Sequence, residues 1–155
     1  MGVIEFWYEF GRIYSYPAAM RIEPLAAEAG VSLPWRPFLL GTIFRTLGWN
    51  ESPFNIFPAK GRYMWRDLER VCAAGGLPLK LPPVKFPQNG LKAARLALVG
   101  EEGGWTPAFT RAVFAANYEV GSASRSLARS LTLALFSCPQ AAMMSRPRGL
   151  RTGLA

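Results

Sequence analysis

The side chains that most often carry enzyme chemistry are few in this chain. It contains no histidine, which excludes the Ser-His-Asp and Cys-His nucleophile arrangements and the histidine-bearing zinc sites. Its two cysteines, Cys72 and Cys138, lie far apart and form no Cys-x-x-Cys pair, so neither a redox motif nor a metal site is indicated. We expect two buried or idle thiols in a reducing compartment. Any catalysis must therefore use other groups.

Positive charge is the second chemical signal, and it is concentrated at one end of the chain. The formal net charge is +8, but all 10 acidic residues precede Gly121. Residues 121–155 hold five arginines, no lysine and no acid, whereas the preceding part is close to balanced. The composition therefore does not predict a nucleic-acid partner for the chain as a whole. Three interpretations of residues 121–155 compete: a basic partner-binding tail, a terminus without function, and translation out of frame, which we favour.

The elements that must position any site begin with a βαβ pattern. Residues 3–10 are β-branched and aromatic with intermittent acids, which predicts a strand. Helical spacing of small and apolar residues follows from Ala18 to a stop at Gly30, with an interruption at Pro24. Residues 31–40 predict a second strand. Because a helix joins the two strands, they should be parallel.

The next part of the chain is predicted to be helical. We expect helices over residues 59–74, 89–99 and 107–118, separated by loops over residues 48–58 and 75–87. Asn89 and Thr106 are the predicted N-caps of the last two helices. Phe109, either Val113 or Ala112, and Ala116 recur at helical spacing in the last helix and should face the core.

The helix over residues 59–74 should have one apolar and one charged side. Its apolar positions are Tyr63, Met64, Leu68, Val71 and Cys72. Arg62, Arg66 and Arg70 fall on another side at four-residue spacing, with Asp67 and Glu69 close by. Such spacing is typical of a solvated, partly paired surface rather than a nucleic-acid interface.

Four stretches of the first 120 residues resemble the 2-hydroxychromene-2-carboxylate isomerase family. They are FWYEFGRIYSYPAAMRIEPLAAEAG, WRPFLLGTIF, GWNESPFNIFPAKGRYMWRDLER and GLPLKLPPVKFPQNGLKAARLAL. This family is related to the kappa-class glutathione transferases and belongs to the DsbA-like thioredoxin superfamily. The resemblance implies an α/β fold in which residues 1–41 form a thioredoxin-like βαβ start and residues 42–120 form an all-helical insertion. Residues 121–155 would be an atypical basic tail, and the C-terminal half of the thioredoxin sheet is not visible in the sequence.

The same resemblance implies a reaction that uses glutathione as a cofactor. Family members catalyse the cis-trans isomerisation of 2-hydroxychromene-2-carboxylate, a step in the catabolism of aromatic compounds. A serine after the first strand activates the glutathione thiol in the family, and Arg12 occupies that position here. Arginine could stabilise a thiolate through its charge, but it is longer than serine. Ser15 matches a different family position and would lie further into the helix start.

Two further positions resemble the family's glutathione contacts. Asn50 offers a donor and an acceptor to the peptide, and Lys60 offers a positive charge to a glutathione carboxylate. The predicted ligands are thus glutathione and a small aromatic-derived substrate, with Arg12 as the catalytic position. Taken with the atypical tail, this predicts a truncated and impaired isomerase homologue.

Other functions remain open at this point. A DsbA-type thiol-disulfide oxidoreductase lacks support because no Cys-x-x-Cys follows the first strand. A glutathione transferase, or a non-enzymatic protein that interacts through its basic tail, would be an alternative. The N-terminus has no basic segment and carries Glu5 in its first apolar run, so we expect a cytoplasmic protein without a membrane partner. Dimerisation like that of kappa-class relatives is left open.

Overall fold

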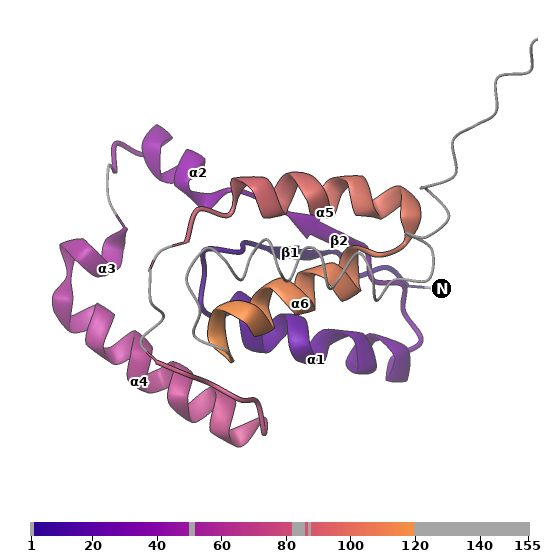
Figure 1. Cartoon of the computed structure of the whole chain (residues 1–155), viewed down its shortest axis with the longest axis horizontal. Helices are drawn as coiled ribbons and strands as arrows, with labels where there is room; N and C mark the ends of the chain where they lie inside the picture. Colours follow the sequence, from indigo (N-terminus) through magenta and orange to yellow (C-terminus); the bar gives the residue numbers. More distant parts are fainter. Residues whose placement is uncertain (1, 50–51, 82–85, 87, 120–155) are drawn as a thin grey trace, which may run out of the picture.

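The computed structural model describes residues 2–49, 52–81, 86 and 88–119, and the predicted tail over residues 121–155 lies outside them (Figure 1). The elements follow one another as β1 (Phe6–Tyr8), α1 (Ser15–Glu28), β2 (Trp35–Pro37), α2 (Leu40–Thr46), α3 (Pro53–Ile56), α4 (Pro58–Ala74), α5 (Leu91–Gly103) and α6 (Thr106–Tyr118). An α/β fold with a helical insertion after the βαβ start is therefore confirmed.

The βαβ start has the predicted parallel pairing. Phe6 lies opposite Trp35 and Tyr8 lies opposite Pro37, and α1 connects the two strands. Each strand is shorter than predicted. The second strand ends at Pro37, and the N–H of Phe38 makes one more bond to β1, to the Tyr8 carbonyl at 3.0 Å. In the described part of the chain these two strands form the whole sheet.

Helix α1 starts earlier than predicted, at Ser15 instead of Ala18. Pro17 is compatible with the first turn of the helix, since the N–H groups there have no intrahelical acceptor. The helix continues through Pro24 rather than ending there. Gly30 follows the end of the helix with a φ of 64°, a left-handed conformation that glycine adopts at low cost.

Three details of the predicted helices are wrong. The segment over residues 48–58 is not entirely a loop, because Pro53 opens the short helix α3. Thr106 does not cap α6; its hydroxyl donates to the carbonyl of Ala97 at 2.6 Å and so ties α6 to α5. The N-cap of α5 is Gly90 rather than Asn89, although the side-chain oxygen of Asn89 accepts from the N–H of Leu91 at 3.1 Å.

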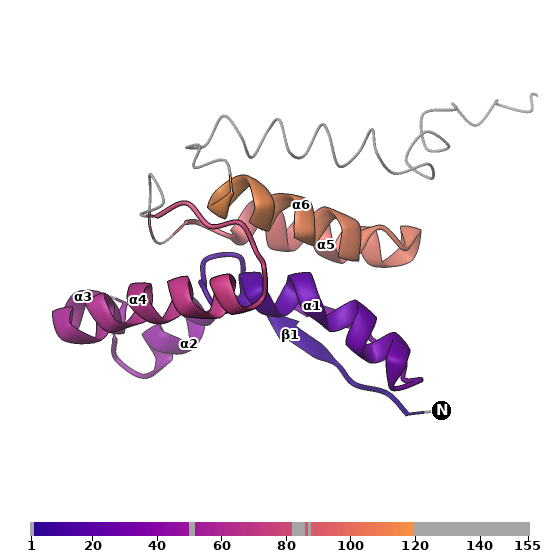
Figure 2. The ribbon, with the colours of Figure 1, turned by 90° about the horizontal axis from the view of Figure 1, so that it is seen from below.

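The two sides of α4 largely follow the sequence pattern. Met64, Leu68 and Cys72 are buried in the main core. Tyr63 is exposed, contrary to the prediction, and the guanidinium of Arg70 lies over its ring. The charged side is solvated as predicted, with Arg66 paired to Glu69 at 3.0 Å. Figures 1 and 2 show α3 and α4 to one side of the strands, with α5 and α6 neighbouring each other.

Aromatic side chains form the centre of the core, between the strands and α6. Phe114 is fully buried and its ring lies within 6.4 Å of Tyr8, centroid to centroid, and within 5.4 Å of Phe10. The Tyr8 hydroxyl forms a 2.7 Å hydrogen bond with the Thr110 hydroxyl, which satisfies both polar groups inside the core. Burial raises the pKa of Tyr8 to about 12, so this phenol is neutral at physiological pH.

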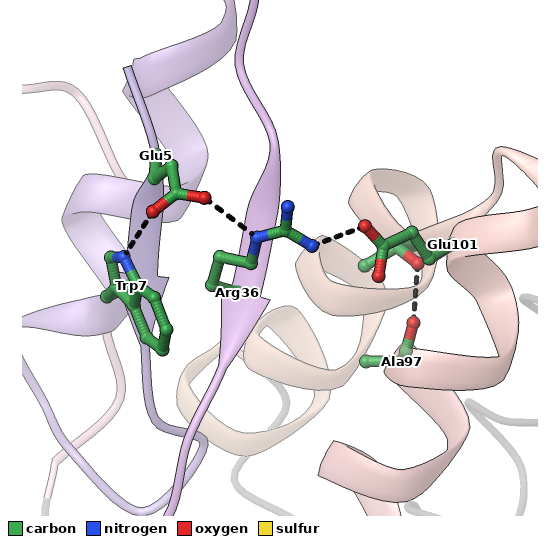
Figure 3. Close-up of polar contacts among 6 residues, drawn as sticks. Glu5, Trp7, Arg36, Ala97 and Glu101 are labelled. Carbon is green, nitrogen blue, oxygen red and sulfur yellow. Dashed lines mark hydrogen bonds and ion pairs between the residues drawn. The ribbon is translucent and has the colours of Figure 1, made fainter. Parts of the chain in front are cut away.

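The opposite face of the strands carries a polar network. Arg36 on β2 donates to Glu5 at 3.1 Å and to Glu101 on α5 at 2.5 Å, and the indole of Trp7 donates to Glu5 (Figure 3). These side chains are solvent-accessible, so each ion pair contributes little stability. The network fixes α5 against β2 rather than forming a reactive centre. No helix among the described residues is long and apolar enough to cross a membrane.

Candidate functional site

Arg12 lies in the loop between β1 and α1. The loop is tight, because the N–H of Arg12 bonds to the carbonyl of Glu9 at 3.1 Å and the N–H of Ser15 bonds to the carbonyl of Arg12. This geometry places Arg12 at the entry to α1, the position predicted for the thiol-activating side chain. The side chain retains 18% of its exposure, so it is accessible to a ligand.

Glu9 holds the Arg12 side chain in place. Its carboxylate accepts from Arg12 Nε at 3.0 Å through one oxygen and from the N–H of Leu40 at 3.2 Å through the other. The Glu9 side chain is only 12% exposed, so these hydrogen bonds replace contacts with water that burial removes. The pair Glu9–Arg12 is therefore a partly buried ion pair that also fixes the start of α2.

The Arg12 guanidinium has two more contacts. Its Nη1 donates to the Ser52 hydroxyl at 3.4 Å, just before α3. Its carbon lies 4.9 Å from the centre of the Phe44 ring, a cation–π distance. One side chain thus connects the β1–α1 loop with α2 and with the start of α3, which explains why its orientation is fixed.

A cleft of about 310 Å³ lies beside Arg12. Three segments form it: the β1–α1 loop, the stretch from Leu39 into α2, and the residues that lead into α5. Its lining consists of Glu9, Gly11, Arg12, Leu39, Gly41, Thr42, Arg45, Gln88, Asn89, Gly90 and Leu91. Segments far apart in the sequence therefore meet at the position that the sequence assigned to catalysis.

Gly11 makes the close approach of two of these segments feasible. A Cβ on Gly11 would lie 2.9 Å from the backbone oxygen of Gln88, which is closer than real Cβ contacts. Gly90 lies on the facing segment, where an added Cβ would lie 3.1 Å from Phe10 Cβ. Because Gly11 and Gly90 have no side chain, the two segments can approach closely, and this approach sets the width of this edge of the cleft.

Replacing Gly11 with alanine should separate these segments. We expect the free energy of unfolding to fall by about 2 kcal/mol, because backbone rather than a mobile side chain opposes the new methyl group. Urea denaturation followed by circular dichroism measures this. Gly41→Ala is the matched control, since it adds the same methyl group in the same cleft but in open space. It should leave stability unchanged or raise it by up to about 1 kcal/mol, as alanine favours the helix. Equal effects of the two changes would show that the close approach does not matter.

Of the other two predicted site residues, the structure describes Lys60 alone. Asn50 lies outside the described residues. Lys60 lies in the first turn of α4, is exposed, and its ammonium is 4.9 Å from the centre of the Phe57 ring. Lys60 is not among the residues that line the cleft. Its assignment to glutathione stays a prediction.

Two residues with reactive groups have structural roles instead. Ser15 accepts a hydrogen bond from the N–H of Glu9 at 3.2 Å and so closes the loop at the first residue of α1. Cys72 is 1% exposed in the core, and burial raises the pKa of its thiol. The raised pKa reduces the fraction of the Cys72 thiol that is present as the reactive thiolate. Among the described residues, no group of acidic or cysteine side chains has the arrangement of a metal site.

The sequence alone did not single out Glu9 and Arg45. Glu9 precedes Arg12 by three residues, but the two lie in a turn rather than a helix, so the helical spacing rule does not predict this pair. Arg45 follows Gly41 by one helical turn, but the sequence pattern does not delimit the short helix α2. The side of the helix on which Arg45 lies therefore cannot be predicted from the sequence.

Comparison with known proteins assigns the chain to a family. A model described as a DsbA-like thioredoxin domain matches residues 3–135, so the match extends past the change of composition at Gly121. The search of curated proteins found no significant match.

Two solved structures are similar in fold. A structure of 2-hydroxychromene-2-carboxylate isomerase has a TM-score of 0.72 and 21% sequence identity, covering 92% of this chain and 69% of that one. A crystal structure of a probable DsbA oxidoreductase from Streptomyces coelicolor has a TM-score of 0.61 and 17% identity, covering 96% of this chain and 69% of that one. At these identities the similarity supports the fold and leaves the reaction to be argued from the site.

Proposed function

The chain belongs to the DsbA-like thioredoxin domain family, and within it we propose a glutathione-dependent isomerase homologue of the 2-hydroxychromene-2-carboxylate isomerase type. One observation carries the proposal: the loop that leads into α1 presents an arginine, Arg12, and no cysteine. Thiol-disulfide exchange needs an attacking and a resolving thiol of the protein itself. Neither is present at this position, so a reaction that brings in an external thiol fits better.

The donors of Arg12 fit an anionic sulfur. A guanidinium has five N–H groups, and the hydrogen bonds of the described residues use its Nε and one hydrogen at Nη1. The donors at Nη2 and the second hydrogen at Nη1 are left for a thiolate. When bound, glutathione would supply a nucleophilic thiolate that can add reversibly to a conjugated substrate.

The neighbours of Arg12 decide how strongly it can act. Hydrogen bonding and positive charge both favour the ionised form of a thiol. Glu9 offsets part of that charge, because its carboxylate lies 3.0 Å from Arg12 Nε. We therefore propose weaker thiol activation than an isolated arginine would give, and a reaction rate limited by this pairing. The fixed orientation of the guanidinium offsets part of this weakening, because the Arg12 side chain loses little conformational freedom when a thiolate binds.

Titration of the chain with glutathione by calorimetry tests this function. We expect binding with a Kd of about 1 mM or tighter, since a charged tripeptide would use Arg12 together with the predicted contacts Asn50 and Lys60. Lys60→Ala should weaken binding about threefold to fivefold, the effect of one exposed charge pair.

Arg62→Ala is the matched control for that titration. It removes a positive charge from the exposed side of the same helix, α4, and it should leave the affinity for glutathione unchanged. Absence of heat at about ten times the expected Kd would refute the proposed function. An equal loss in Lys60→Ala and Arg62→Ala would refute the role of Lys60 and point to general attraction by the positive charge of α4.

A further inference from the structure

Strand β1 has a second long side that no strand occupies within the part of the chain that the structure describes. The sheet there consists of β1 and β2 alone, and Figure 3 shows Arg36 of β2 between Glu5, just before β1, and Glu101 of α5. β2 therefore covers one side of β1. The pairing starts at a bridge between Val3 and Ser32, so the extended segment is longer than β1 itself. We call the other side of residues 3–7 the outer edge.

The outer edge presents unpaired backbone groups. The N–H groups of Ile4 and Phe6 bond to carbonyls just before β2, at 3.0 and 2.9 Å. Because successive residues of a strand direct their N–H and C=O groups to opposite sides, those of Val3, Glu5 and Trp7 point to the outer edge. Among the described residues, no backbone group bonds to them. The outer edge therefore has the donors and acceptors that an added strand needs.

Apolar side chains at the outer edge are exposed. Val3 is 64% exposed and Trp7 is 59% exposed, and both point to the same face of the sheet as Glu5 because side chains alternate along a strand. Ile4, on the opposite face, is 52% exposed. Contact of these side chains with water is unfavourable, so their burial against another chain is favoured.

Glu5, in the middle of the outer edge, does not block an added strand. A charge at a sheet edge usually opposes pairing, and two like charges directly opposite each other are unfavourable. Here Arg36 donates to Glu5 at 3.1 Å, and the indole of Trp7 donates to the same carboxylate at 3.2 Å. The negative charge is therefore compensated within its own chain, and each copy would bring its own arginine to an interface.

The outer edge is complementary to itself. In an antiparallel pair whose two-fold axis passes between the two Glu5 residues, Val3 of one copy lies opposite Trp7 of the other, since each is two residues from Glu5. A β-branched residue opposite an aromatic one is a favourable cross-strand pair. In this register every free backbone group of Val3, Glu5 and Trp7 gains a partner. The sequence of the outer edge therefore favours a second copy as its occupant.

We propose that the outer edge binds a second copy of this chain as an antiparallel strand, so that the two sheets join across a two-fold axis at Glu5. The inference goes beyond the proposed function, which concerns glutathione at Arg12, and it holds whether or not glutathione binds. An interface centred on residues 3–7 is smaller than that of a stable dimer. We therefore expect a weak dimer with a Kd of about 100 µM.

Sedimentation velocity of the full chain, without glutathione, tests the association. Over a range of about 5 to about 500 µM, the chain should change from almost entirely monomer to mostly dimer. A chain that stays monomeric over the whole range would overturn the proposal. Because the measurement does not involve glutathione, this outcome would leave the proposed function unaffected.

Amide hydrogen exchange shows whether the outer edge forms the interface. The N–H groups of Glu5 and Trp7 should exchange about threefold more slowly at about 500 µM than at about 5 µM chain, because the dimer covers them. The N–H groups of Ile4 and Phe6 are the controls, since they bond toward β2 in monomer and dimer alike. Slow exchange of Glu5 and Trp7 at every concentration would show that another part of the same chain covers the outer edge, and would overturn the proposal.

The variant pair Arg36→Gln and Arg95→Gln tests the charge balance. Arg36→Gln should weaken the dimer about fivefold, because it leaves two carboxylates opposite each other. Arg95 is an exposed arginine on α5, so Arg95→Gln should leave the Kd of the dimer unchanged. Adding Glu5→Gln to Arg36→Gln should restore the dimer, which a merely structural role of Arg36 would not allow. Equal Kd values for Arg36→Gln and Arg95→Gln would overturn the proposed arrangement.

Disulfide cross-linking tests the register. In the proposed dimer the two Glu5 Cα atoms lie about 5.5 Å apart, within the range of disulfides, whereas the two Val3 Cα atoms lie about 14 Å apart. Glu5→Cys should therefore form a cross-linked dimer under mild oxidation, and Val3→Cys should not. Both variants are made with Cys138→Ser, so that the native thiol left is that of the buried Cys72. Cross-linking of Val3→Cys as fast as Glu5→Cys, or of neither, would overturn the register.

Discussion

Replacing Phe114 with alanine should lower the free energy of unfolding by about 4 kcal/mol, a large share of the roughly 5–15 kcal/mol that stabilises a typical domain. Phe114 is fully buried, and its ring is surrounded by the aromatic side chains of β1, α1 and α6. The change removes the ring contacts and leaves a cavity that rigid aromatic neighbours cannot collapse to fill. Urea denaturation monitored by circular dichroism and by tryptophan fluorescence measures the loss.

Leu98→Ala is the control for that measurement. Leu98 lies on α5 and is 51% exposed, so its truncation should change stability by no more than about 0.5 kcal/mol. Phe114→Leu should be intermediate, because it keeps most of the apolar volume. If Phe114→Ala were tolerated like Leu98→Ala, α6 would not be packed on the strands as described.

Replacing Arg12 with alanine has the second largest expected effect, a loss of about 3 kcal/mol. The Glu9 carboxylate would keep its bond to the N–H of Leu40 but lose its only oppositely charged partner among the described residues. An uncompensated carboxylate that is 12% exposed is costly, because little water can reach it. Chemical denaturation of the variant at neutral pH measures the loss.

A double-mutant cycle separates the ion pair from the other contacts of Arg12. Glu9→Gln in the Arg12→Ala background should recover stability, because the buried charge is then absent. We expect a coupling energy of about 2 kcal/mol between the two positions. Arg62→Ala, which removes an exposed arginine, should have almost no effect. If the losses of stability in the two single variants, Glu9→Gln and Arg12→Ala, added up to the loss in the double variant, the pairing would be contradicted.

The main elements could be predicted because local signals agree with the tertiary structure there. The aromatic run at Phe6–Tyr8 forms a strand with one buried face, and the apolar spacing at Phe109 and Val113 forms the buried side of α6. The sequence predicts Thr106 as a cap because threonine is common at the N-cap and proline is common at the first helical position. Its hydroxyl bonds instead to Ala97, a tertiary partner that no local pattern reveals. Tyr63 was placed in the core because its apolar ring matches the helical period, but it lies one position beyond the buried stripe.

The site could be predicted only in part, for a similar reason. The resemblance located Arg12, and the loop before α1 does present it beside a cleft. The pairing of Arg12 with Glu9, its contact with Phe44, and the approach of Gly11 to Gln88 all depend on how distant segments meet. The position of the site therefore stays a prediction from the sequence, whereas the charge balance around Arg12 and the second arginine of the cleft, Arg45, are visible only in the structure.

The pH titration of bound glutathione tests the central proposal most directly. Thiolate formation is followed by its ultraviolet absorbance with the chain in excess, and S-methylglutathione, which has no thiol, gives the background. If Arg12 stabilises the thiolate, the pKa of bound glutathione should lie about one unit below that of free glutathione in the native chain. The shift should vanish in Arg12→Gln, which keeps a polar side chain but removes the charge. A bound thiol that titrates like the free one in both proteins would contradict the account.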